Sequence, residues 1–173
     1  MKILLAVAVL LVPGCTRTAP PDMSKTKQEV RDKYPTVRQM PTADLARRLA
    51  DSSQPAPVLV DVRLPAEYAV SHLSGARNVP PGTSPTDALK DVPKDATIVA
   101  YCSVGYRSSA FAQKLAKAGY TSVWNLEGSM FEWANEGRPI VDDKGPAKVV
   151  HPYDAKWGQL LRPELRAQVK DAE

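Results

Sequence analysis

The residues of this chain whose types and spacing could carry out chemistry lie in one loop. In order they are Cys102, Ser103, Val104, Gly105, Tyr106 and Arg107. A cysteine thiolate is a strong nucleophile, and the arginine adds a permanent positive charge on a planar fork that suits an oxyanion. Gly105 allows a tight turn without a Cβ penalty. The alternative interpretation of Cys102 is a small buried hydrophobe, a common role for cysteine.

The position of this loop explains why it could activate a thiol. It follows an apolar run that predicts a strand, residues 97–101, and precedes a segment that predicts a helix, 108–118. Backbone N–H groups are free where a helix begins, and the helix dipole adds partial positive charge there. Such a junction binds anions and lowers the pKa of a cysteine, so the loop predicts a nucleophilic thiolate.

Other polar residues have a structural interpretation that we favour over a catalytic one. Asp61, Arg63 and Glu67 follow a predicted buried strand and could line the rim of the site, but buried charges need partners, which favours a charge network. His72 could act as a base, and we expect instead a packed, hydrogen-bonded imidazole. His151 has no cysteine or carboxylate at metal-ligand spacing, so we predict neither a metal site nor a cofactor.

The elements that must position the loop alternate along the chain. Three short apolar runs predict strands, at residues 58–62, 97–101 and 122–126. Four segments predict helices, at residues 42–50 with Thr42 as N-cap, 65–71, 108–118 and 129–136. Continuous apolar strands suit a parallel sheet that is buried on both faces, and the alternation indicates an α/β domain with helices on both sides.

The segments outside this alternation differ in character. Residues 24–34 are mostly charged and predict a short exposed helix that Pro35 ends. The tail from 143 to 173 is too apolar for disorder, and we expect it to fold back on the domain and to end in a short helix from about Pro163. Trp124, Trp133 and Trp157 are predicted core residues.

The N-terminus has the features of an export signal. Lys2 precedes a run of ten apolar residues, which is too short to span a bilayer, and Val12-Pro13-Gly14-Cys15 resembles the lipobox of bacterial lipoproteins. Pro13 departs from the lipobox pattern. There are two alternatives. One is cleavage near Ala19, which would give a soluble exported protein, and the other is an apolar N-terminus that is not cleaved. If Cys15 carries lipid, Cys102 is a lone thiol in an oxidising compartment, which favours a chemical role.

Composition limits the classes of function. The chain has 173 residues and a net charge of +4, with no basic run that would follow a phosphate backbone, so nucleic-acid binding has no support. The length suits one domain, and we expect a monomer. The predicted boundaries are a signal peptide at 1–14, a lipid-anchored tether and N-terminal segment at 15–35, the domain at 36–142 and the C-terminal extension at 143–173.

Three motifs in order resemble the rhodanese-like family. They are Val58–Arg63 with Glu67-Tyr68 and His72–Pro80, the loop Tyr101–Ser108, and Leu126–Trp133. Ser71 stands where many members have glycine. The resemblance implies a three-layer fold with a mainly parallel sheet of about five strands. It also implies a sulfurtransferase in which Cys102 takes the outer sulfur of a small anionic donor such as thiosulfate and passes it, as a persulfide, to a thiol or cyanide.

The resemblance assigns the other loop residues a binding role. Arg107 would orient the anionic end of the donor, and backbone N–H groups of Ser103, Val104, Gly105 and Tyr106 would stabilise the persulfide. Two rivals remain. A cysteine phosphatase or arsenate reductase uses a loop one residue longer, with arginine where Ser108 stands. A lipid-tethered persulfide or redox carrier would need no efficient thiosulfate turnover.

Overall fold

The structure, a computed structural model, describes residues 22–169. The predicted signal peptide and Cys15 lie outside this range, so the membrane anchor and the cell-envelope location stay predictions. No helix within 22–169 combines the length and the apolar character needed to cross a bilayer. The helices are α1 (Met23–Lys33), α2 (Thr42–Ala50), α3 (Pro65–Val70), α4 (Pro85–Ala88), α5 (Tyr106–Lys117) and α6 (Ser129–Asn135), with 3₁₀ turns η1 (Trp157–Leu160) and η2 (Pro163–Leu165).

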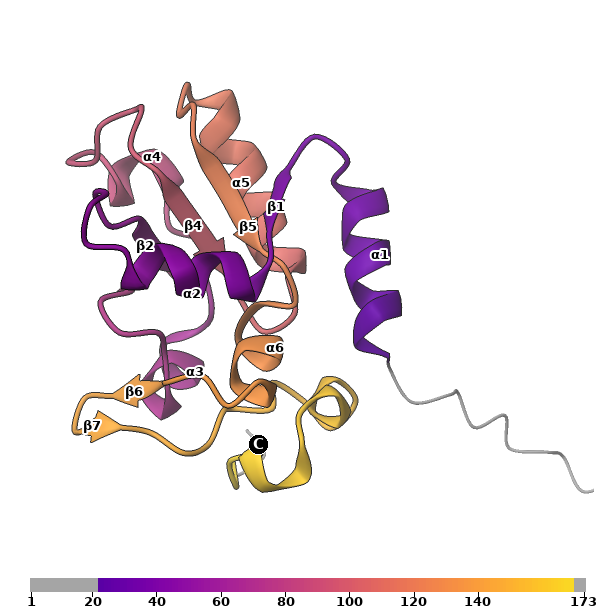
Figure 1. Cartoon of the computed structure of the whole chain (residues 1–173). Coiled ribbons are helices and arrows are strands. Elements are labelled where there is room, and N and C mark those ends of the chain that lie inside the picture. The colour runs from indigo at the N-terminus through magenta and orange to yellow at the C-terminus, as the bar shows by residue number, and fades with distance from the viewer. Residues whose placement is uncertain (1–21, 170–173) are drawn as a thin grey trace, which may run out of the picture.

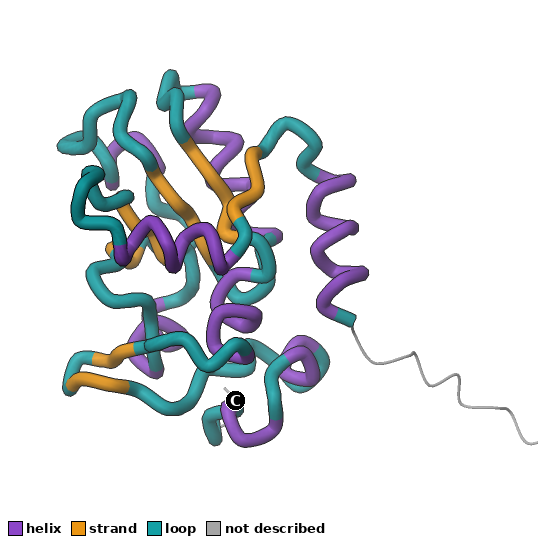
Figure 2. The backbone as a smooth tube through the Cα atoms, in the orientation of Figure 1, coloured by secondary structure: helices purple, strands orange, loops and turns teal. Residues whose placement is uncertain are grey.

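A five-stranded sheet forms the centre of the molecule (Figures 1 and 2). Its strands are β1 (Arg38–Met40), β2 (Val58–Asp61), β3 (Arg77–Asn78), β4 (Ile98–Tyr101) and β5 (Val123–Leu126). The order is β1-β5-β4-β2-β3, and every neighbouring pair is parallel. This confirms the predicted α/β fold. The edge strands β1 and β3 were not predicted, because two or three residues carry too little apolar pattern.

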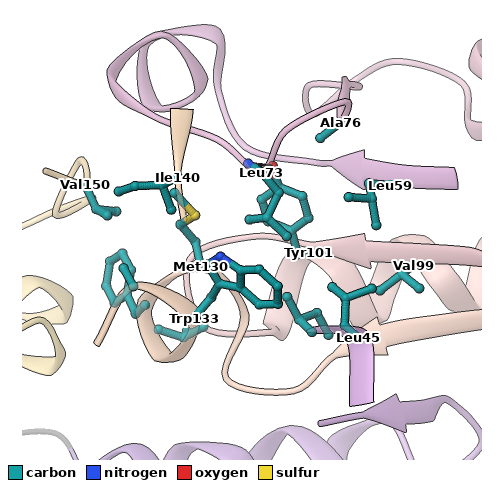
Figure 3. Close-up of a cluster of buried hydrophobic side chains, with 14 of the residues drawn as sticks. Leu45, Leu59, Leu73, Ala76, Val99, Tyr101, Met130, Trp133, Ile140 and Val150 are labelled. Atoms are coloured by element: carbon teal, nitrogen blue, oxygen red, sulfur yellow. Dashed lines mark hydrogen bonds between the residues drawn. The ribbon is translucent and has the colours of Figure 1, made fainter. Parts of the chain in front are cut away.

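Alternation along the strands divides the core between the two faces of the sheet. Val99 and Tyr101 of β4 face a cluster that includes Leu45 of α2 and Met130 of α6, drawn in Figure 3. Ile98, Ala100 and Cys102 face the other cluster, which α5 covers through Phe111, Ala112 and Leu115. Figure 1 shows α2 and α5 on opposite sides of the sheet. The side chain of Cys102 therefore belongs to the α5 side.

Helix α1 corrects the expectation of an exposed N-terminal helix. It forms where predicted, but Val30 is buried and Lys27 contacts Glu132 at 2.8 Å. Arg31 pairs with Glu127 at 2.5 Å, in the turn between β5 and α6. A charged helix can dock through ion pairs that no apolar periodicity reveals, which is why the sequence pattern predicted exposure.

Thr42 has a different role from the predicted N-cap. Pro41 occupies the cap position of α2 and Thr42 is the first helical residue. The Thr42 hydroxyl instead donates to Glu136 at 2.7 Å, just beyond the end of α6. Thr42 thus links the first helix of the domain to the last one.

The segment after α6 folds back against the body of the domain. A two-strand hairpin, β6 (Val141–Asp142) with β7 (Gly145–Pro146), starts it, and Val150, Leu160 and Leu161 are buried in the same cluster as Met130. Figure 1 shows the hairpin in orange and the later part of this segment in yellow, close to α6. The helix expected from Pro163 is the 3₁₀ turn η2, only three residues long.

Candidate active site

Cys102 follows directly after β4, the middle strand of the sheet. Parallel strands place their carboxyl ends at one edge, which is where α/β folds bind ligands. The residue is 1% exposed, and it is the one free cysteine within residues 22–169. The thiol is therefore held at the floor of the loop, and a reacting molecule has to enter the loop to reach it.

The loop directs hydrogen-bond donors at the sulfur. The Gly105 N–H donates to Sγ at 3.1 Å, and the Ser108 hydroxyl lies 3.5 Å from it. Helix α5 begins at Tyr106, and no side chain caps its N-terminus. Burial by itself would raise the pKa of the Cys102 thiol, but the charge of Arg107 and the bonds from Ser108 and Gly105 lower it below its ordinary value. These contacts favour the nucleophilic thiolate.

The carbonyl groups of the loop point the other way, toward α6. The amides of Met130 and Phe131 donate to the carbonyls of Cys102 and Ser103, each at 3.1 Å. The Cys102 N–H donates to the Ser129 hydroxyl at 3.2 Å. The N-terminus of α6 thus satisfies the loop carbonyls of Cys102 and Ser103, while on the other side of the loop the Gly105 N–H donates to the sulfur.

Gly105 is required by the shape of the turn. Its φ is +115°, a left-handed value that residues with a Cβ rarely adopt. An added Cβ would lie 3.3 Å from the Asn125 side-chain nitrogen and 3.6 Å from Val30 of α1. The turn is therefore enclosed by β5 on one side and by α1 on the other.

Arg107 is engaged by a carboxylate that the sequence did not pair with it. Its two terminal nitrogens donate to the two oxygens of Glu67 at 2.7 and 2.8 Å, and Nη2 also donates to the Ser103 hydroxyl. Ser103 in turn donates to Glu67. Burial would raise the pKa of Glu67, but the Arg107 contacts hold it below its ordinary value. This network fixes Arg107 and offsets much of its charge.

The predicted charge network has two separate parts. Glu67 joins the loop, whereas Asp61 and Arg63 form a fully buried pair at 2.6 Å that also contacts the Ser71 carbonyl. His72 is buried, stacks on the ring of Tyr68, and donates from Nδ1 to the Tyr68 carbonyl at 3.1 Å. Asp61, Arg63 and His72 do not line the space over the thiol.

A cavity of about 300 Å³ lies over the loop. It is lined by Cys102, Ser103, Val104, Tyr106, Arg107, Tyr153 and Trp157. The last two belong to the C-terminal segment, and Trp157, predicted as a core residue, is only partly buried. Sequence spacing could not place Tyr153 and Trp157 at this cavity, because no pattern in the neighbouring residues indicates which part of the domain a folded-back segment contacts. Gly105, whose N–H donates to the sulfur, does not line the cavity.

The contribution of α1 was also missed. The Tyr106 hydroxyl donates to Glu29 at 2.8 Å. Partial burial and this bond to a carboxylate raise the pKa of Tyr106 to about 12, so the phenol stays protonated at neutral pH. Among residues 22–169, no group of three or more histidine, cysteine or acidic side chains is placed to hold a metal ion.

Comparisons with known proteins agree with this geometry. The family profile of the rhodanese-like domain matches residues 42–136. A sulfurtransferase from Allochromatium vinosum is 37% identical over 109 residues, which is 63% of this chain and 99% of that protein. The probable adenylyltransferase/sulfurtransferase MoeZ of Mycobacterium tuberculosis is 34% identical over 82 residues, 47% of this chain but only 21% of MoeZ.

A solved structure extends the likeness to the fold. The rhodanese-like domain protein of Staphylococcus aureus superposes with a TM-score of 0.54 at 29% identity. The superposition covers 62% of this chain and 99% of that one. The matched family region contains the Cys102 loop and Glu67, and it ends before the hairpin and the two aromatic residues of the C-terminal segment.

Proposed function

The chain belongs to the rhodanese-like domain family, and from that premise we propose that it is a sulfurtransferase that works through a persulfide on Cys102. A sulfane-sulfur compound such as thiosulfate is the donor, and a thiol is the acceptor, with cyanide as its substitute in an assay. The observation that carries this proposal is the Cys102 thiol, buried at the floor of a small cavity among donors that lower its pKa.

The first step loads the protein with sulfur. The Cys102 thiolate attacks the outer sulfur of thiosulfate, a new S–S bond forms, and the donor's own sulfur–sulfur bond breaks as sulfite leaves with the electron pair. Cys102 keeps a persulfide anion. Its negative charge is stabilised by the loop N–H groups and by the start of α5, where Gly105 already donates to Sγ.

The second step regenerates the thiolate. An acceptor thiolate attacks the outer sulfur of the persulfide, so the acceptor becomes the persulfide and Cys102 leaves as thiolate. The atoms and electrons balance without an external oxidant or reductant. Neither step needs a side-chain base, which agrees with a site that lowers the pKa of its nucleophile and places His72 outside the cavity.

Arg107 supports both steps in this proposal. It lies 27% exposed in the cavity wall, and its charge lowers the pKa of Cys102. Because Glu67 binds two of its nitrogens, the guanidinium is fixed in place and only its remaining N–H groups are free for a donor. Glu67 and Ser103 are positioning residues, since they act on the reaction through Arg107.

Intact-mass measurement of the purified protein after thiosulfate treatment tests the proposal. We expect the mass to rise by one sulfur atom and to return on addition of cyanide or a thiol. Cys102→Ser should gain no sulfur. If the wild-type protein also gains none from any sulfane-sulfur donor, the proposed function is wrong.

Steady-state turnover separates the enzyme from a carrier. An enzyme forms thiocyanate from thiosulfate and cyanide continuously, and Cys102→Ser abolishes that production. If Cys102 takes up one sulfur but thiosulfate sustains no turnover, the protein is better described as a persulfide carrier whose exchange partner is another protein. Hydrolysis of a phosphate ester that depends on Cys102 would favour the phosphatase rival instead.

A further inference from the structure

Two walls of the cavity over Cys102 come from a segment that the family match does not include. The match ends at residue 136, whereas Tyr153 and Trp157 both line the cavity. They share the lining of this space of about 300 Å³ with the loop residues Val104 and Tyr106. The shape of this cavity is therefore a property of the C-terminal segment as much as of the loop.

Contacts on both sides hold this segment in place. The Val150 N–H donates to the Leu165 carbonyl at 2.7 Å, and the Ala167 N–H returns a bond to Val150 at 3.0 Å. Asn135 of α6 donates to the Leu160 carbonyl at 2.7 Å and accepts from the Arg162 N–H. The aromatic side chains are thus carried by a backbone that is bonded to the domain.

Tyr153 reaches the cavity through an unusual backbone conformation. Its φ is +67°, one of two non-glycine residues with positive φ among those the structure describes, and its N–H donates to Nδ1 of His151. The conformation places its ring 4.8 Å from the Arg107 guanidinium carbon. Strain of this kind persists where surrounding structure imposes it, often at binding sites. Tyr153 lies over the guanidinium although the residue as a whole is 45% exposed.

Trp157 is the second aromatic residue that the C-terminal segment contributes to the cavity. It meets Tyr106 edge to face, with ring centroids 5.9 Å apart. Tyr106, Tyr153 and Trp157 thus give the cavity that holds the thiol three aromatic side chains in its lining. An aromatic surface of this kind binds flat or aliphatic groups and offers little to a hydrated anion.

The charges around the cavity also favour an apolar group over a hydrated anion. Among residues 22–169, Arg107 is the one charged residue that lines it, and Glu67 already pairs with that guanidinium in a two-pronged bond. Lys33 and Lys156 lie over the rings of Tyr106 and Trp157, but neither lines the cavity. A dianion such as thiosulfate would lose much of its hydration here and meet one partly neutralised cation.

We propose that Tyr153 and Trp157 are specificity-determining residues that favour sulfur donors whose leaving group carries an apolar substituent. This inference rests on the proposed function, since it concerns the donor that loads Cys102. For a thiosulfonate, the Cys102 thiolate attacks the terminal sulfur, the sulfur–sulfonyl bond breaks, and a sulfinate leaves with the electron pair. The apolar substituent of that sulfinate would lie between the two rings.

Rates of persulfide formation on the full-length protein test this inference. The probes are benzenethiosulfonate, methanethiosulfonate and thiosulfate, with sulfur uptake followed by intact mass. The first two share one reactive group and one charge, and their intrinsic reactivities cancel when the rate ratio of a variant is compared with that of the wild type. We expect the wild type to prefer the phenyl donor to the methyl donor by at least about tenfold, a ratio typical of apolar pockets.

The variants are Tyr153→Gly, which removes an exposed ring and relieves the positive φ, and Trp157→Leu, which keeps an apolar side chain where part of the residue packs on the core. Either should reduce the phenyl-to-methyl ratio to below about threefold, mainly by slowing uptake from the phenyl donor. Leu49→Ala is the control, because Leu49 is an exposed apolar residue that lines a different cavity.

The outcomes separate two failures. If no donor loads Cys102, the proposed function itself is wrong. If all three donors load it and the phenyl-to-methyl ratio is close to one, or stays unchanged in both variants, only the specificity role of the two rings is wrong. An equal loss of the phenyl-to-methyl preference in Leu49→Ala would also overturn the specificity role, since the effect would then not arise at the cavity over Cys102.

Discussion

At the scale of single residues, spacing along the chain located Cys102 and Arg107, but not the side chains that bind them in the folded protein. Cys102 and Arg107 were found because a strand, a glycine and a helix start frame them. The bond from Arg107 to Glu67 joins residues forty positions apart, and only the fold brings them together. The same holds for Ser108, whose hydroxyl lies near both Sγ and the Asn125 oxygen.

Replacing Ser108 by alanine tests how the thiolate is stabilised. The hydroxyl has one proton to share between Asn125 and the sulfur, so its effect on Cys102 should be modest. Without it the pKa of Cys102 rises, and less thiolate is present at neutral pH. We expect alkylation of Cys102 by iodoacetamide to slow about threefold at pH 7, with the same plateau at high pH where the thiol is fully ionised.

Ser109→Ala is the matched control for this experiment. Ser109 is an equally buried serine on the next position of α5, and its hydroxyl has no partner within the described residues. Its pH profile should superimpose on that of the wild type. A Ser108→Ala profile that also superimposes would show that the hydroxyl does not stabilise the thiolate, and a lower plateau would indicate altered access to the sulfur.

At the scale of elements, the sequence predicted the strands and helices whose apolar pattern extends over enough residues to be recognised. The strands β2, β4 and β5 and the helices α2, α3, α5 and α6 lie where apolar runs and turn residues indicated them. The two edge strands and the docking of α1 left no periodic trace. Their formation depends on pairing and ion contacts with distant parts of the chain.

The junction of β4 with α5 depends on Gly105, and a substitution there measures how tightly the loop is packed. Gly105→Ala combines the strain of a positive φ with a Cβ that lies 3.3 Å from Asn125. We expect a loss of about 1–3 kcal/mol in the free energy of unfolding, measured with urea. Persulfide formation should slow as well, because the Gly105 N–H that donates to Sγ is displaced.

Gly119→Ala separates strain from crowding. Gly119 has a φ of +89°, but an added Cβ would meet no atom of the described part of the chain within 4 Å. Both variants lose backbone freedom in the unfolded chain to the same extent, so the difference between them reports the contact with Asn125 and Val30. Equal losses in the free energy of unfolding would mean that β5 and α1 do not confine the loop. Sulfur uptake by Cys102 should be normal in Gly119→Ala.

At the scale of the whole molecule, two cores and one buried charge pair hold the sheet to its surroundings. The apolar tail was expected to fold back, and its leucines do enter the core, but the tail also forms part of the cavity over Cys102. That second role needs the positions of α6, the loop and the tail at once. No pattern within the tail could have predicted it.

The pair Asp61–Arg63 belongs to this scale because it ties three segments together. Arg63 also donates to the Ser71 carbonyl at 2.6 Å, and Asn78 of β3 donates to the carbonyls of both residues of the pair. Both side chains are 0% exposed. A buried carboxylate that loses its cation remains desolvated and unpaired, which is among the larger costs that one substitution can impose.

We therefore expect Arg63→Met to lower the free energy of unfolding by about 3–5 kcal/mol, measured by urea titration. Arg77→Met is its control, since Arg77 pairs with Asp91 at 2.9 Å with both side chains about half exposed. That variant should lose less than about 1 kcal/mol. Comparable losses in the two variants would mean that Asp61 regains water or a proton when Arg63 is removed. In that case burial of the pair would contribute little to the stability of the domain.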